Sequence, residues 1–331
     1  MVAICLENLT LDLVQKAFST IRDSIVCSPI SFSAAFSELV DSDTYLKYEG
    51  AQLTGSFKIR GALFHLSKLS GEKKAKGVFA CSAGNHGLAV AYAASKEAIP
   101  CTIYVPKHAD SVKVDKIMQL GAKVEYSAYP GYDDTLAWAE EIVSTQGLSL
   151  ISAFNDPLIM AGNGGTLALE LLEQMSGIEN ILFPVGGGGL AAGLCYAMKE
   201  LAPHIRLIGC QHQDSPSLFL SLQQRKAVTK LPAIETLASG IEGGIGENCF
   251  KILQDRIDNV CLASEEEIQR GVLWLLEKEQ YLVEPSSAVT IACCLGERPP
   301  LLKGKTVVIL TGRNVSFGTL KKIYQKNFCN Q

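Results

Sequence analysis

The sequence predicts an α/β protein built from mostly parallel, twisted sheets that are flanked by helices. Short runs of β-branched and apolar residues alternate with longer amphipathic stretches, which is typical of consecutive βαβ units. Turns that contain glycine stand where the expected strands give way to the expected helices. The chain has 331 residues, of which 47% are hydrophobic, and this is enough for two domains with buried cores.

Two separate series of strand and helix signals run along the chain. The first series comprises expected strands at 77–80, 101–105 and 123–126 and expected helices at 87–95, 111–120 and 135–145. The second comprises expected strands at 180–185, 206–209 and 305–310 and expected helices at 190–201 and 265–278. Ser264 opens the last of these helices, and acidic residues occupy its first turn. Because each series can supply its own sheet, we expect two domains.

The composition argues against several classes of partner. The formal net charge is -4 and no basic patch is visible, so a nucleic-acid partner is not expected. No apolar run is long enough to span a bilayer, and an N-terminal segment with Glu7 and Asp12 lacks the pattern of a secretory signal. The eleven cysteines lie mostly in apolar contexts without a CxxC pair or zinc-ligand spacing. We therefore expect a cytoplasmic protein without a metal site that acts on a small molecule.

The first glycine-containing turn, Cys81–Gly87, follows the strand that is expected to end at Ala80. Small residues there let backbone N–H groups converge at a helix N-terminus, where a carboxylate or a phosphate can bind. A tight turn with a purely structural role explains the same residues equally well. This stretch alone does not decide between the two interpretations.

The second turn contains four consecutive glycines, Gly186–Gly189. Such a run costs backbone entropy, which indicates that a ligand or another chain segment approaches closely, and a phosphate at the N-terminus of the next helix fits. A dinucleotide fingerprint is the alternative, because Gly187, Gly189 and Ala192 satisfy GxGxxA. That alternative expects an acidic residue at the end of the next strand, where this chain has Gln211. The dinucleotide interpretation is therefore disfavoured.

The third turn, Thr311–Asn314, closes the last expected strand, and by itself it is a turn of ordinary structural character. All three turns follow the carboxyl ends of expected parallel strands, which is where open α/β sheets bind ligands. One shared ligand would explain all three.

Lys58 stands in the stretch TGSFKIRGA, where small residues surround it and Phe57 precedes it. A single lysine is usually a solvated surface charge. A lysine that is desolvated among small residues has a lowered pKa and becomes a nucleophile for aldehydes. Together with the phosphate turn, such a lysine points to pyridoxal phosphate as the ligand.

These motifs together resemble the fold-type II pyridoxal-phosphate enzymes, most of all the threonine/serine dehydratases, with serine racemase as a near relative. The matching residues are, in order, Glu49, Thr54–Ala62, Ser82–His86, Gly186–Gly189, Val283–Pro285 and Thr311–Asn314. The resemblance implies two domains, each with a central, mostly parallel twisted sheet flanked by helices. A large cofactor-binding domain would comprise residues 1–74 and 153–331, and a small mobile domain, residues 75–152, would be inserted into it.

The resemblance also implies roles for individual residues. Lys58 would form the Schiff base with pyridoxal 5′-phosphate and later act as the base at the substrate Cα, while Phe57 would lie against the ring and Thr311 would face its nitrogen. The backbone amides of Gly186, Gly187, Gly188 and Gly189 would bind the cofactor phosphate. Asn85 would donate a hydrogen bond to the 3-oxygen of the ring, and Gly240 and Glu284 would line the cofactor. The substrate carboxylate would meet the backbone of Ser82, Ala83, Gly84, Asn85 and His86.

The function that the resemblance implies is β-elimination, in which a hydroxy amino acid such as L-threonine or L-serine is dehydrated and deaminated to a 2-oxo acid and ammonia. The hydroxyl of Thr311 favours this reaction, because it does not keep the pyridine nitrogen protonated and leaves a weaker electron sink than a carboxylate would. A nicotinamide-dependent oxidoreductase is the alternative from another class. We also expect a homodimer and no appended regulatory domain.

Three features depart from the family pattern. Serine racemases carry a second serine where this chain has Ala83, so amino-acid racemisation is an alternative that this alanine disfavours. Gln211, Ser215 and Ser217 stand where some relatives have metal-binding carboxylates, so a divalent-cation site is not expected. Arg313 replaces a glycine. It either admits an extra acidic group, which would make a modified 3-hydroxy amino acid the substrate, or lies on the surface.

Overall fold

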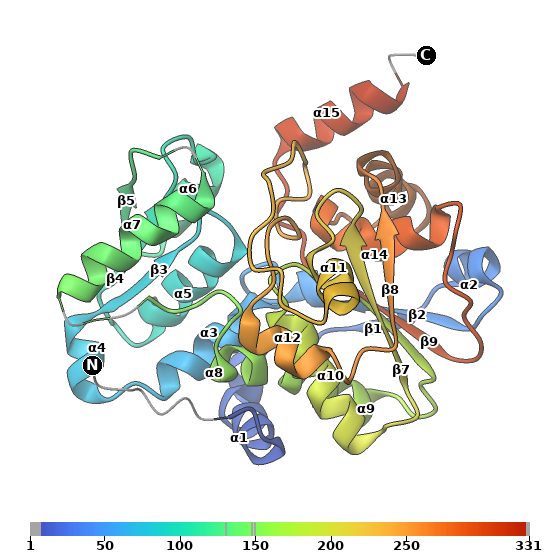
Figure 1. Cartoon of the computed structure of the whole chain (residues 1–331), viewed down its shortest axis with the longest axis horizontal. Coiled ribbons are helices and arrows are strands. Elements are labelled where there is room, and N and C mark those ends of the chain that lie inside the picture. The colour runs from blue at the N-terminus through green and yellow to red at the C-terminus, as the bar shows by residue number, and fades with distance from the viewer. Residues whose placement is uncertain (1–7, 130, 147, 149, 329–331) are drawn as a thin grey trace.

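A computed structural model of the chain describes residues 8–129, 131–146, 148 and 150–328, and two sheets organise this part (Figure 1). The larger sheet has the strand order β1-β2-β9-β6-β7-β8, with β1 at Ile30–Phe32, β2 at Thr44–Tyr48, β9 at Thr306–Leu310, β6 at Asn180–Pro184, β7 at Arg206–His212 and β8 at Asn259–Ala263. The smaller sheet has the order β3-β4-β5, with β3 at Val78–Cys81, β4 at Cys101–Val105 and β5 at Lys123–Tyr126. Neighbouring strands are parallel except β1, which is antiparallel to β2. The predicted α/β fold with mostly parallel sheets is confirmed.

Helices flank both sheets. Those that follow the chain around the small sheet are α4 (Gly71–Lys76), α5 (Asn85–Lys96), α6 (Ser111–Gln119) and α7 (Tyr132–Thr145). The remaining helices are α1 (Leu11–Ile21), α2 (Ala34–Val40), α3 (Lys58–Ser67), α8 (Pro157–Met160), α9 (Thr166–Gln174), α10 (Gly189–Leu201), α11 (Ser217–Gln224), α12 (Glu247–Leu253), α13 (Glu265–Lys278), α14 (Pro285–Leu295) and α15 (Phe317–Phe328). Short 3-10 turns lie at Arg22–Ser24 (η1) and Glu49–Ala51 (η2), and a π-helical turn at Ala161–Gly165 (η3) joins α8 to α9.

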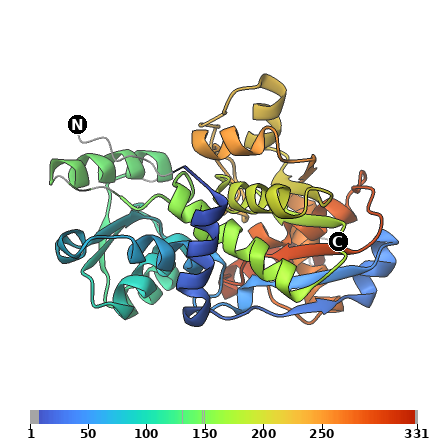
Figure 2. The same ribbon diagram turned by 90° about the horizontal axis from the view of Figure 1, so that it is seen from below.

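The two sheets lie in separate lobes, with α1 near their junction (Figure 2). The small sheet falls within residues 78–126, inside the segment 75–152 that was predicted as the small domain. The proposed domain boundaries themselves stay predictions. Helix α3, which begins at Lys58, packs against α5 of the small lobe and against η3 of the large one, so it links the two.

Local sequence accounts for several element boundaries. The Ser264 hydroxyl accepts from Glu267 N while the Glu267 carboxylate accepts from Ser264 N, which is a complete capping box at the start of α13. By contrast, β7 continues past the expected end at 209, because Cys210–His212 pair in parallel with β8. The strand β8 carries a weak local signal, and our sequence analysis did not identify it.

The cysteines of the described residues are free thiols rather than disulfides. Seven of these nine cysteines are buried, including Cys293 and Cys294 on α14, a helix that is buried on all sides. Helix α14 packs between α13 and strands of the large sheet, which explains its composition. The interpretation of most cysteines as small buried hydrophobic residues agrees with this placement.

Four charged side chains form a closed cluster inside the large lobe, where β2, η2, α3 and α9 meet. The Arg60 guanidinium donates to both oxygens of Glu49 at 2.8 Å and to Glu170 Oε2 at 2.9 Å. Lys47 Nζ donates to Glu170 Oε1 and to Ser28 O. These four charged side chains are at most 4% exposed, so two cations balance two anions away from water. Burial alone would raise the pKa of Glu49, but Arg60 holds it below its ordinary value.

Replacing the central cation should strongly destabilise the fold. Arg60→Met has a similar volume but leaves the buried Glu49 carboxylate without its cation and the cluster with one negative charge in excess, and we expect the free energy of unfolding to fall by about 3–5 kcal/mol. Urea unfolding followed by circular dichroism measures this. The matched control is Lys76→Met, which breaks an exposed pair with Glu72 at 3.0 Å and should cost about 0.3–0.5 kcal/mol. Equal costs for the two variants would contradict the importance of the cluster.

Candidate active site

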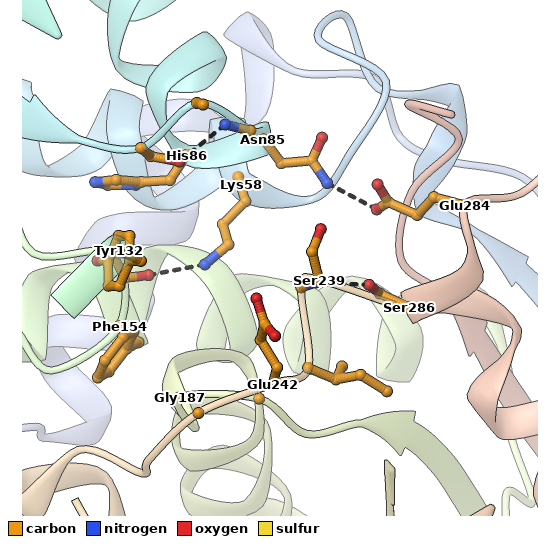
Figure 3. Close-up of a pocket in the computed structure, with 18 of the residues that line it drawn as sticks. Lys58, Asn85, His86, Tyr132, Phe154, Gly187, Ser239, Glu242, Glu284 and Ser286 are labelled. Carbon is orange, nitrogen blue, oxygen red and sulfur yellow. Dashed lines mark hydrogen bonds between the residues drawn. The ribbon is translucent and has the colours of Figure 1, made fainter. Parts of the chain in front are cut away.

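A cavity of about 660 Å³ lies where the turns after β3, β6 and β9 meet the start of α3 (Figure 3). The structure brings every predicted site residue to the wall of this cavity: Phe57, Lys58, Ser82, Ala83, Gly84, Asn85, His86, Gly186, Gly187, Gly188, Gly189, Gly240, Glu284 and Thr311. The three glycine-containing turns, which are far apart in sequence, therefore face one shared space. One ligand can contact all of them.

Lys58 is the first residue of α3, and its amine reaches into the cavity. Its Nζ donates a hydrogen bond to Ala153 O at 2.8 Å and lies 5.3 Å from the centre of the Phe57 ring. Burial lowers the pKa of Lys58 to about 8, although the nearby Cys249 and Glu284 act in the opposite direction. A substantial fraction of this amine is therefore neutral near pH 8, which is the form that attacks an aldehyde.

The four glycines between β6 and α10 are required by close packing. A Cβ on Gly186 would lie 2.5 Å from Gly240 O, and one on Gly187 would lie 2.3 Å from the Phe154 ring. Gly188 has a φ of +94°, a conformation that side chains disfavour. The loop thus brings bare backbone to the N-terminus of α10, where N–H groups of the first turn have no partner within the helix. Such a cradle suits a phosphate.

A chain of hydrogen bonds crosses the cavity wall beside Lys58. Asn85, the first residue of α5, donates from Nδ2 to Glu284 Oε1 at 2.7 Å. Asn314 Nδ2 donates to Asn85 Oδ1 at 2.7 Å and to Thr54 O at 2.8 Å. Burial raises the pKa of Glu284 to about 7, against the opposing effects of Asn85 and the Lys113 and Lys58 charges. Our sequence analysis missed Asn314 as a site residue, because its partners are distant in sequence.

The turn after β3 presents small groups and a neutral imidazole. The Ser82 hydroxyl accepts from Gly84 N at 3.1 Å, and the side chain of Ala83 is a methyl group. The His86 ring donates from Nε2 to Ile151 O at 2.9 Å, because a carbonyl oxygen only accepts. Burial, together with the Lys58 charge, lowers the pKa of His86 to about 3, so its ring is neutral.

The turn after β9 is joined to the segment that carries Lys58. Ser56 and Gly312 form a β-bridge, and Phe57 N donates to Thr311 O at 3.1 Å. A Cβ on Gly312 would lie 2.2 Å from Glu284 Oε1, so glycine makes room for that carboxyl group. Arg313 is exposed and is absent from the cavity lining, which favours a surface arginine over one that binds an extra acidic group of the substrate.

Gln211 makes hydrogen bonds only within the protein. Its Oε1 accepts from Leu218 N and Phe219 N at 3.0 Å, and its Nε2 donates to Val185 O and to the Ser217 hydroxyl at 3.3 Å. It therefore does not take the place of the acidic residue that a dinucleotide site would use. Among the described residues, no group of three or more histidines, cysteines or carboxylates could hold a metal ion.

Other residues of the cavity were not identified from the sequence. Phe154 packs on the glycine loop, and Ser239 and Glu242 come from the segment before α12 (Figure 3). Lys113 and Tyr132 line the cavity from α6 and α7. None of these residues lies in a distinctive motif, so no local signal marks them.

Comparison with known proteins identifies the class of enzyme. The family model described as "Pyridoxal-phosphate dependent enzyme" matches residues 21–312, and the chain belongs to this family. It is 38% identical to an L-threonine ammonia-lyase of Geobacter sulfurreducens over 95% of this chain and 78% of that protein. It is 34% identical to the catabolic L-threonine dehydratase TdcB of Escherichia coli K12, over 87% of this chain and 88% of the relative.

Solved structures agree with this assignment. A serine racemase from maize superposes with a TM-score of 0.87 at 28% identity, covering 98% of this chain and 99% of the other. The processed threonine deaminase isoform 2 of Solanum lycopersicum gives 0.87 at 29% identity, over 98% and 97% of the two chains. The predicted fold-type II resemblance and the pyridoxal-phosphate cofactor are confirmed, and a nicotinamide oxidoreductase is not supported. No helix of the described residues is both long and apolar enough to cross a membrane.

The cavity of this chain fits the cofactor of its family. Lys58 supplies a buried amine, and the glycine loop at the start of α10 supplies bare backbone that packs too closely on neighbouring segments to accept a Cβ. Phe57 and Thr311 complete the wall around the space between them. The roles of individual residues stay predictions that the following variants test.

Adding one methyl group to the glycine loop should weaken cofactor binding. In Gly186→Ala the new Cβ would meet Gly240 O at 2.5 Å and Ile241 Cα at 3.2 Å, so backbone must move. We expect the dissociation constant for pyridoxal phosphate to rise roughly tenfold or more, which is about 1.4 kcal/mol. Titration of the apoprotein, followed by visible absorbance, measures it. Gly71→Ala, where no atom lies within 4 Å of the new Cβ, is the control and should bind normally.

The reaction of the apoprotein with pyridoxal phosphate should depend on the protonation of Lys58. Only the neutral amine attacks an aldehyde, so the rate should increase about tenfold per pH unit below pH 8 and level off above it. Stopped-flow absorbance across pH 6 to 9.5 measures this profile. Glu284→Gln removes a charge that raises the pKa of Lys58, so it should move the midpoint to lower pH. A midpoint near 10.5, the ordinary value of lysine, would contradict the desolvated amine.

Proposed function

We propose that this protein is a pyridoxal-phosphate-dependent ammonia-lyase that eliminates water from a 3-hydroxy amino acid such as L-threonine or L-serine, giving a 2-oxo acid and ammonia. The observation that carries the proposal is the position of Lys58. A buried amine with a lowered pKa faces the same cavity as the N-termini of α5 and α10. The similarity to proteins named L-threonine ammonia-lyase and L-threonine dehydratase supports the same reaction.

Two helix N-termini bind the anionic groups in this proposal. The amides of Gly186–Gly189 hold the cofactor phosphate at α10, and the backbone of Ser82–His86 receives the substrate carboxylate at α5. Asn85 donates to the 3-oxygen of the cofactor ring, and Gly240 and Glu284 line the ring edge. The bound cofactor supplies an aldehyde for covalent attachment and an electron-accepting ring that stabilises negative charge at the substrate Cα.

Lys58 then acts as the base. With substrate bound, Lys58 Nζ would accept the proton from the substrate Cα. A pKa near 8 suits this task, because the amine is partly neutral at physiological pH yet remains a strong enough base. Thr311 offers a hydroxyl near the ring nitrogen rather than a carboxylate. This favours loss of the β-hydroxyl over reactions that need a longer-lived carbanion.

Two alternatives concern the substrate and the outcome. Racemisation is suggested by the similarity to maize serine racemase, but Ala83 offers no proton on the face of Cα away from Lys58. A modified 3-hydroxy amino acid with an extra polar group is favoured by Lys113, whose charge acts on Glu284 and which lines the cavity. We also propose that the protein is a cytoplasmic homodimer, and sedimentation analysis tests the oligomeric state.

The ratio of products tests the proposed reaction. L-serine and L-threonine should yield pyruvate and 2-oxobutyrate on the order of 10²-fold faster than they yield D-serine and D-allothreonine, the products of inversion at Cα, because a positioned proton donor on the second face is missing. A coupled 2-oxo acid assay and chiral chromatography measure both products. The same assay, applied to hydroxy amino acids with a second carboxylate or amine, identifies the preferred substrate.

Ala83→Ser should shift this ratio toward the D-enantiomer, because its hydroxyl can return a proton to Cα. Ala83→Gly is the matched control, since it removes the methyl group without adding a proton donor, and it should leave the ratio unchanged. If the unmodified enzyme forms D-serine as fast as pyruvate, another residue must serve the second face and the proposal is wrong.

A further inference from the structure

We propose that Asn314 is a positioning residue that fixes the orientation of the Asn85 carboxamide, so that Asn85 presents an N–H group and not its carbonyl to the cofactor. The inference rests on the proposed function only in taking Asn85 as the donor to the cofactor's 3-oxygen. Asn314 itself acts through Asn85, because its amide nitrogen is already bonded to protein groups on both sides.

The direction of the hydrogen-bond chain follows from one backbone carbonyl. Thr54 O can only accept, so the Asn314 atom that lies 2.8 Å from it must be the amide nitrogen. The same nitrogen lies 2.7 Å from Asn85, and it can only donate, so the Asn85 atom that it meets must be Oδ1. The Asn85 nitrogen is then the atom 2.7 Å from Glu284 Oε1. No choice between oxygen and nitrogen remains along the chain.

The side-chain amide of Asn314 is also held in place by the backbone at Gly55. Gly55 has a φ of +74°, and a Cβ built on it would lie 2.7 Å from Asn314 Oδ1 and 3.0 Å from Nδ2. The amide therefore packs directly on the bare backbone of Gly55. The backbone just before Asn314 is also fixed, because Arg313 N donates to Gly55 O at 2.9 Å. Little space is left for the Asn314 side chain to rotate.

A reversed Asn85 carboxamide would be unfavourable at both ends. Its NH₂ group would face the NH₂ group of Asn314, and its carbonyl oxygen would face the carboxyl oxygen of Glu284. The hydrogen bond to Asn314 would be lost in every protonation state, and the bond to Glu284 would be lost whenever that carboxyl group is ionised, so that both contacts then place like partial charges together. With the observed orientation, one Nδ2–H of Asn85 goes to Glu284, as the dashed line in Figure 3 shows, and the other is left for a ligand in the cavity that Asn85 lines.

The test compares two substitutions of Asn314 in the full-length protein. Asn314→Ala removes the restraint, so Asn85 can adopt either orientation. Asn314→Asp has the same shape but only accepts, so it should draw the NH₂ group of Asn85 toward itself and turn the carbonyl into the cavity. We expect the dissociation constant for pyridoxal phosphate to rise several-fold in the alanine variant and at least tenfold in the aspartate variant. Titration of the apoproteins measures it.

A spectroscopic readout separates positioning from general damage. A donor on the 3-oxygen draws off negative charge that otherwise holds the neighbouring proton, so its loss should move the pH titration of the bound cofactor's visible band to higher pH. The shift should be larger for Asn314→Asp than for Asn314→Ala. Asn327→Asp on α15, whose Nδ2 donates to Ile323 O far from the cavity lining, is the control and should change neither the affinity nor the titration.

A double variant completes the test. In an Asn85→Ala background, Asn314→Asp should weaken the cofactor no further, since the residue through which it acts is gone. A full additional loss in that background, or equal effects of the alanine and aspartate variants, overturns the inference. If Asn85→Ala alone leaves the affinity and titration unchanged, the proposed role of Asn85 fails instead, and the two failures are thereby distinguished.

Discussion

The buried pairing of Arg60 with Glu49 and Glu170 is the interaction on which the rest of the site depends. Arg60 lies two residues after Lys58 on α3, and its partners come from η2 and α9. Because no water can compensate these charges, α3 is held in one position relative to the large sheet. Because Lys58 belongs to the same helix, its amine is held in one position as well. A salt-bridged cluster on one side of the helix thus determines where the reactive lysine lies on the other.

Signals confined to a few neighbouring residues were readable from the sequence. The capping box at Ser264, the strand and helix rhythm and the glycine run at Gly186–Gly189 each follow from local chemistry, and they were located correctly. Contacts between distant segments were not readable. Asn314 donates a hydrogen bond to Asn85, although most of the chain separates the two residues in sequence. Strands β1 and β8 form because they pair with neighbouring strands, more than because of the β-propensity of their own residues.

In the proposed function, backbone amides rather than charged side chains bind the anionic groups of the cofactor and the substrate. Burial moves the pKa of Lys58 to about 8, that of Glu284 to about 7 and that of His86 to about 3, so Lys58 and Glu284 change their charge close to neutral pH while His86 stays neutral. The backbone amides at the starts of α5 and α10 do not titrate. Anion binding can therefore persist across the pH range in which Lys58 changes its protonation state. A change in the protonation state of Lys58 therefore need not change the affinity of the cavity for anionic groups.

The central place of β9 in the large sheet has a consequence for synthesis of the protein. Strand β9 lies between β2 and β6, although β2 precedes it by most of the chain and β6 by more than a third of it. While the chain emerges from the ribosome, the facing edges of β2 and β6 have no partner until β9 has left the exit tunnel, and such unpaired edges invite aggregation. The bridge between Ser56 and Gly312 also forms only then. Nascent chains are therefore expected to need chaperone protection late in translation and to take up cofactor only after it.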